Sequence, residues 1–101
     1  MTRPIETTTI EKRRSLRLIL KGTPGNRLEQ QRARIIQALE LGTLNTSEAQ
    51  SFLRVYDPPA RVCELRHVMG FKIKTHMMLV QTSLGDVHRL GVYVLTRGGK
   101  P

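Results

Sequence analysis

The sequence has 101 residues, with 17 lysines and arginines against 8 aspartates and glutamates, and its formal net charge is +9. This length allows one small domain, and a hydrophobic content of 39% without tryptophan allows one modest core but no large buried cavity. No apolar run is long enough for a membrane span, no apolar leader stands at the N-terminus, and a single cysteine excludes an internal disulfide, so we expect a cytoplasmic protein.

The positive charge is concentrated in the first and last parts of the chain. Residues 1–24 carry six basic and two acidic residues, residues 25–57 carry four of each, and residues 58–101 carry seven and two. A charge that served only solubility would not need this segregation. The distribution points to a polyanionic partner, either nucleic acid or an anionic surface.

Residues 1–25 have a basic pattern that fits two local structures. The alternation from Leu16 to Lys21 suits a strand, whereas a helix would align Arg13, Arg14 and Arg17 in a basic stripe. The pattern leaves both alternatives open. We expect a basic arm, partly ordered or flexible, whose three arginines contact nucleic-acid phosphates; a solvated tail is the alternative.

Residues 26–41 form the clearest helical pattern. Asn26 is a suitable N-cap and Gly42 a suitable end, and between them lies an apolar stripe of Leu28, Ile35, Ile36 and Leu39. The charged side chains of this segment balance, which indicates a packing helix. Residues 43–44 that follow are an extended connector that could pair with a later strand.

Residues 45–70 predict two short helices of about three turns joined by a tight turn, the size of a helix-turn-helix unit. Asn45 can cap the first helix, with Glu48 in its first turn. Asp57 can cap the second helix, since Pro58 and Pro59 then occupy positions where a missing backbone N–H costs nothing.

The outer face of the second helix, residues 58–69, presents small and polar side chains beside arginines. Val62, Leu65 and Met69 define its core side. Such a face could approach base edges in a DNA groove while the arginines reach guanine or phosphate; an ordinary solvated helix face is the alternative. The candidate groove residues are Pro59, Ala60, Arg61, Glu64, Arg66 and His67.

After Gly70 the period changes to that of strands, which predicts a hairpin. Alternation begins at Phe71, residues 83–86 have turn chemistry, and residues 87–95 form the return strand, with His88, Arg89 and Tyr93 on its exposed face. Lys72, Lys74 and Arg89 are candidate phosphate partners. Three helices followed by a hairpin is the element order of a winged helix.

Two stretches, LNTSEAQSFLRVYDPPARVCELRHVMGFKIKT and DVHRLGVYVL, resemble a family of small winged helix-turn-helix proteins of phages, prophages and mobile elements. The resemblance covers about residues 35–95. It implies a winged helix-turn-helix domain of the α+β class. From composition we expect this domain over residues 26–96, between a basic arm 1–25 that lies outside the resemblance and a flexible tail 97–101. The resemblance also implies double-stranded DNA as the partner of a transcriptional regulator or excision factor associated with the nucleoid.

The hairpin departs from this family in being unusually apolar at Met77, Met78 and Leu79. Methionine-rich surfaces suit protein partners, which favours a protein-binding inhibitor or adaptor, or a homodimer through the hairpin, as the alternative function. RNA binding is a weaker third alternative, because the few aromatic residues look like core residues.

No chemistry of catalysis is visible in the sequence. We find no glycine-rich phosphate loop, no zinc-type spacing and no nucleophile with a base, and we expect no enzyme and no cofactor. Cys63 and His67 are four residues apart on one helix, but a metal would need further ligands such as His76 or His88, so no metal site is predicted.

Overall fold

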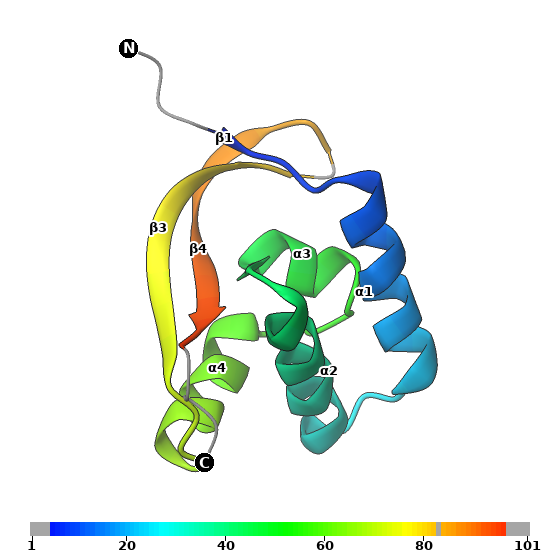
Figure 1. The fold of residues 1–101 in the computed structure, drawn as a ribbon, viewed down its shortest axis with the longest axis vertical. Coiled ribbons are helices and arrows are strands. Elements are labelled where there is room, and N and C mark those ends of the chain that lie inside the picture. The colour runs from blue at the N-terminus through cyan, green and yellow to red at the C-terminus, as the bar shows by residue number, and fades with distance from the viewer. Residues whose placement is uncertain (1–4, 83, 97–101) are drawn as a thin grey trace.

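The computed structural model describes residues 5–82 and 84–96. Its elements are β1 (Ile5–Glu6), α1 (Ile10–Gly22), α2 (Leu28–Leu41), β2 (Leu44–Asn45), α3 (Thr46–Ser51), α4 (Pro58–His67), β3 (Ile73–Gln81) and β4 (Val87–Leu95) (Figure 1). The mixed helix and strand content confirms the α+β class. The flexible tail predicted for residues 97–101 lies outside the described residues.

The strands form one sheet in the order β1-β3-β4-β2. β3 and β4 are the predicted antiparallel hairpin, paired from Ile73 and Leu95 to Gln81 and Val87. The connector after α2 pairs with β4 as expected, with Leu44 opposite Tyr93. β1, which the sequence did not predict, pairs in parallel with β3. Figure 1 shows the long hairpin arching along one side of the helices until its far end lies beside the start of α1.

Twist along the hairpin lets opposite faces of β3 meet the body of the protein. Ile73 and Val80 are both buried. Because they are seven residues apart, their side chains point to opposite faces of the strand, so each face meets the protein at a different place. Tyr93, expected on the exposed face, is buried as well, and its hydroxyl lies 3.2 Å from Thr46 Oγ1. The expectation was wrong because this face of β4 packs against the helices, where Tyr93 joins the common hydrophobic core.

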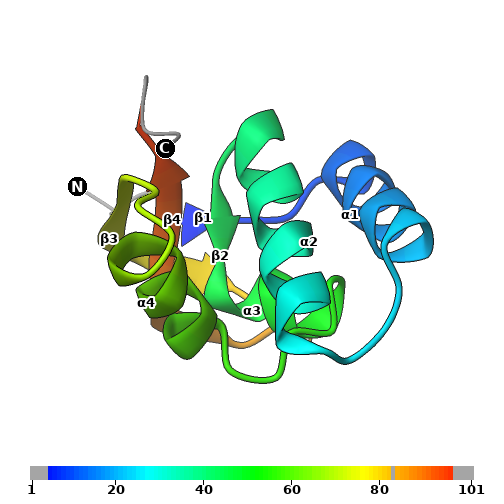
Figure 2. The ribbon, with the colours of Figure 1, turned by 90° about the horizontal axis from the view of Figure 1, so that it is seen from below.

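The described part of the N-terminal segment contains a short strand, β1, and a helix, α1. Thr9 caps α1 by accepting a hydrogen bond from the backbone N–H of Lys12, and Leu16 and Ile19 are buried in the core. The strand interpretation of residues 16–21 is therefore wrong and the helical one is correct. Figure 2 shows α1 on one side of α2 and α4 on the other.

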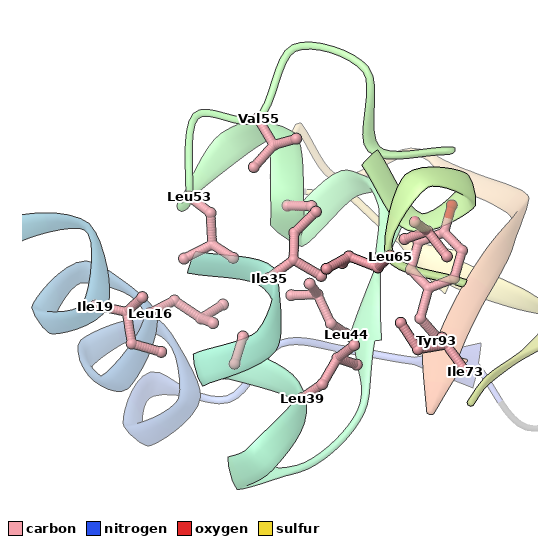
Figure 3. Packing of buried hydrophobic residues seen from close by; sticks show 13 residues of the cluster. Leu16, Ile19, Ile35, Leu39, Leu44, Leu53, Val55, Leu65, Ile73 and Tyr93 are labelled. Atoms are coloured by element: carbon pink, nitrogen blue, oxygen red, sulfur yellow. The ribbon is translucent and has the colours of Figure 1, made fainter. Parts of the chain in front are cut away.

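The core lies between α2, the sheet and the remaining helices. Figure 3 shows Leu65 of α4 reaching toward Ile35 of α2, with side chains from the other elements around them. Because α4 buries Val62 and Leu65 against this core, its orientation relative to α2 is set by packing. The labelled members of the cluster are Leu16, Ile19, Ile35, Leu39, Leu44, Leu53, Val55, Leu65, Ile73 and Tyr93.

Arg34 of α2 is a cation buried in the interior of the protein. Its side chain is fully buried and donates to the carbonyl oxygens of Leu53 (2.8 Å), Thr23 (2.9 Å) and Gly25 (2.8 Å), with a longer contact of 3.5 Å to that of Arg54. Burial lowers the pKa of Arg34. The guanidinium thereby joins the loop before α2 to the turn after α3.

Candidate nucleic-acid interface

Both helices of the helix-turn-helix unit begin where local capping chemistry dictates. Asn45 accepts from the N–H of Glu48, and Glu48 accepts from the N–H of Asn45, which is a reciprocal capping box. Asp57 caps α4 through the N–H of Ala60 at 3.3 Å, and Pro58 is in its first turn. These predicted caps are confirmed, but α3 has only six residues instead of about three turns.

The turn between α3 and α4 contains a cation that the sequence analysis missed. Arg54 is exposed and has a φ of +53°, a left-handed conformation that non-glycine residues rarely adopt. Its carbonyl oxygen is the most distant acceptor of Arg34. The sequence signal that could have identified Arg54 as a candidate DNA contact is its place between the two helices of a helix-turn-helix unit.

The outer face of α4 is formed by Pro59, Cys63 and His67, which are all exposed. They follow one another at intervals of four residues and so share one side of the helix. Ala60 is partly exposed beside them. Pro59 and His67 therefore lie where the sequence predicted, on a surface of small side chains with one imidazole.

Arg61 and Glu64 lie on the side of α4 that is turned toward α2. Arg61 Nε and Nη2 donate to the two carboxylate oxygens of Glu64 at 2.7 and 2.9 Å, and Arg32 Nη1 of α2 donates to Glu64 Oε1 at 3.2 Å. The hydrogen bonds from Arg61 lower the pKa of Glu64. The Arg61 side chain is only 14% exposed. The expected position of both residues on the outward face is thus corrected, because Arg32 on a neighbouring helix draws them inward.

Arg66 links the end of α4 to the start of β3. Its Nε donates to the carbonyl oxygen of Ile73 at 2.6 Å, and its Nη2 donates to the Thr75 hydroxyl. Lys72 and Lys74 are exposed at this junction. A group of cations therefore borders the C-terminal end of the candidate recognition helix.

The remaining predicted phosphate partners are exposed but lie elsewhere. Arg89 is on β4, opposite Leu79 in the register. Arg13, Arg14 and Arg17 are exposed on α1, and the Arg17 guanidinium lies 6.0 Å from the centre of the Phe52 ring just after α3. Figure 2 shows α1 and α4 on opposite sides of α2. The arginines of α1 are therefore separated from Lys72 and Lys74, which lie near the end of α4.

Within the described ranges, no cluster of three histidine, cysteine or acidic side chains could hold a metal ion, so Cys63 and His67 are not joined by further ligands. Among the helices of the described residues, none is both long and apolar enough to cross a membrane.

No match to a curated protein or to a solved structure was found. Residues 30–98 match the sequence model of a winged helix-turn-helix domain, which takes in nearly all of α2 and every element after it and leaves α1 outside. Domains of this kind suggest a DNA partner and are typically not enzymes. The match covers most of the chain, and within it the helices are followed by a hairpin, as in a winged helix. The chain therefore belongs to the winged helix-turn-helix domain family.

Proposed function

We propose that this protein binds double-stranded DNA at specific sequences, with α4 in the major groove, as a small transcriptional regulator or excision factor of a phage or mobile element. The observation that carries the proposal is the outer face of α4, where Pro59, Cys63 and His67 are exposed within a winged helix-turn-helix domain. The phage context rests on the sequence resemblance. A cytoplasmic location at the nucleoid follows from the same partner.

Different residues take different parts in this mode of binding. The small side chains of α4 allow close approach to base edges, and His67 supplies a hydrogen-bonding group there. Lys72, Lys74, Arg89 and the turn residue Arg54 are exposed cations suited to phosphates. Glu64 is bound to Arg32 of α2 and Arg66 to Ile73 of β3, and these contacts help to hold α4 in place. Arg61 is paired with Glu64 within α4 and could reach a base only by leaving it.

The proposal is tested by selecting binding sites from randomised duplex DNA and then comparing two variants. His67→Ala should lower the ratio of specific to non-specific affinity by about tenfold, because a base contact is lost. Lys74→Ala should lower both affinities together and reduce the slope of log K against log salt by about 0.9. Failure to enrich any sequence, or an unchanged ratio in His67→Ala, would contradict base reading by α4.

The two regulatory roles differ in what they do to DNA. An excision factor should bind repeated sites cooperatively and bend them, whereas a simple repressor or activator needs neither. Circularly permuted fragments carrying the selected site, run on a native gel, distinguish the roles because a bend at the centre slows migration most.

A protein partner is the second candidate function, favoured by two apolar surfaces. Met77 is 54% exposed on β3, although Leu79 beyond it is paired with Ile5 of β1. A separate apolar hollow of about 310 Å³ lies between α2 and the end of α4, beside Met69 and Phe71. An inhibitor, an adaptor or a homodimer would use such surfaces, and its association should persist in high salt, where DNA contacts weaken steeply.

A further inference from the structure

An open recess of about 270 Å³ lies where three parts of the chain meet: the segment between β1 and α1, the start of α3, and the far end of the hairpin. Figure 1 shows the end of the hairpin beside the start of α1, with α3 close by. Its lining is mixed, with slightly more polar than apolar surface. The lining residues are Thr7, Thr8, Arg13, Ser47, Phe52, Gln81, Thr82 and Gly85.

The hydrogen bonds around the recess leave donors unused. Thr82 Oγ1 is buried, and no residue of the described ranges forms a hydrogen bond with it. A buried hydroxyl without a partner is costly, so this group is suited to a ligand that accepts a hydrogen bond. Gln81 is committed to the carbonyl oxygen of Gly85 at 3.3 Å, and Thr8 donates to Glu48 at 2.6 Å.

Two carboxylates, those of Glu6 and Glu48, lie beside the segment that lines the recess, and both are near Lys12. Glu48 lies behind Thr8 with its side chain 1% exposed, and Lys12 Nζ is 2.9 Å from its Oε1. Lys12 thus offsets part of the negative charge, since it is also 3.9 Å from Glu6 Oε1. Arg13 adds a positive charge at the rim that is exposed to solvent.

We infer that this recess binds one phosphate of the DNA backbone, with Arg13 as the charged contact and the hydroxyls of Ser47 and Thr82 as donors. A phosphodiester oxygen only accepts hydrogen bonds, which matches a wall of hydroxyls beside a guanidinium. The inference rests on the proposed DNA binding. It singles out Arg13 from Arg14 and Arg17, which are exposed on the same helix but do not line the recess.

This assignment extends the DNA surface beyond the part that matches the family. α1 and the segment before it lie outside residues 30–98, yet they contribute Thr7, Thr8 and Arg13 to a site shared with α3. A backbone phosphate held there would fix the start of α3, and through the following turn it would fix the angle at which α4 meets the duplex.

The test replaces single phosphates of the selected duplex by uncharged methylphosphonates and measures binding of the wild type, Arg13→Gln and the matched control Arg14→Gln. In the wild type, each contacted phosphate should cost about tenfold in affinity when replaced, the order expected for a hydrogen bond to a charged group, and one of these positions should be coupled to Arg13. Arg13→Gln should lose the sensitivity at that position alone, while Arg14→Gln should keep it. Thr82→Val should weaken the same coupling, with circular dichroism confirming that each variant is folded.

Other results have definite meanings. A wild type that binds the duplex but has no phosphate coupled to Arg13 would overturn the assignment and leave the DNA-binding function intact. A wild type that binds no duplex would overturn both. Perturbation of Ser47 and Thr82 resonances by inorganic phosphate, without a coupled backbone phosphate, would assign the recess to a free phosphate and would also overturn the inference.

Discussion

Arg34 shows how one side chain can connect two loops that are far apart in sequence. Its planar guanidinium donates in several directions at once, to Thr23 and Gly25 before α2 and to Leu53 and Arg54 after α3. Those carbonyl oxygens would otherwise need other partners, because a buried unpaired acceptor is costly. The turn of the helix-turn-helix unit, with Arg54 at positive φ, is thus supported from inside the protein.

Substituting Arg34 by lysine should therefore be destabilising despite the retained charge. A lysine has one ammonium group and cannot donate to both loops, so at least one buried acceptor loses its partner at a cost of about 1–3 kcal/mol. We expect urea unfolding to give a loss in this range or above. Arg14→Lys on the exposed face of α1 is the matched control and should change stability by less than about 0.5 kcal/mol. Equal effects in the two variants would mean that the Arg34 contacts contribute nothing.

The helices α2 and α4 are joined by a charged group made of Arg32, Arg61 and Glu64. The folded-state pKa of Glu64 lies below its ordinary value of 4.5, chiefly because Arg61 donates to the carboxylate. An acid whose pKa is lower in the folded state than in the unfolded state adds to the free energy of unfolding at pH values above its unfolded-state pKa. This contribution is lost as the pH falls through its folded-state pKa.

The stability difference between the wild type and Glu64→Gln should consequently depend on pH. It should be constant above about pH 5 and should shrink as the pH falls below about 4.5, since only the wild type carries this titration. Chemical denaturation of both proteins across this range measures it, and the other acids cancel in the comparison. A difference that is constant down to about pH 3 would show that the arginines do not stabilise the carboxylate in the fold.

Elements whose signals are local could be predicted from the sequence. Asp57 and Pro58 define the start of α4 by capping chemistry, and the return strand Val87–Leu95 has the predicted bounds. α1 was ambiguous because its leucines fit a period of two as well as a helix. The burial of Leu16 and Ile19 against α2, which settles the choice, is a tertiary contact.

The candidate site was predictable to the same extent. A helical period places Pro59, Cys63 and His67 on one face, and these residues are exposed as expected. It cannot say which polar flank meets another helix, and so Arg61 and Glu64 were assigned outward although Arg32 holds them toward α2. The recess around Arg13 was also beyond sequence reasoning, because its walls come from segments separated by more than thirty residues.

For the whole molecule, the main question is whether the N-terminal helix belongs to the folding unit or is an added DNA-binding arm. The division of the chain at residue 25 was made from composition and remains a prediction. α1 contributes Leu16 and Ile19 to the common core, and Lys12 pairs with the buried Glu48 at the start of α3. These contacts indicate that folding and the charged surface of α1 are coupled.

Deleting residues 1–24 should accordingly reduce stability as well as DNA binding. Each of Leu16 and Ile19 contributes about 1.5–3 kcal/mol by burial, and the loss of Lys12 leaves the Glu48 carboxylate without its charge partner. We expect the free energy of unfolding in urea to fall by about 3–6 kcal/mol, a large share of the 5–15 kcal/mol typical of a small domain. The full-length variant Arg14→Gln, Arg17→Gln is the control, because it removes two exposed charges without touching the core and should keep its stability while its salt dependence of DNA binding flattens. If the truncated chain unfolded within about 1 kcal/mol of the full chain, residues 30–98 would fold independently and α1 would be an accessory helix.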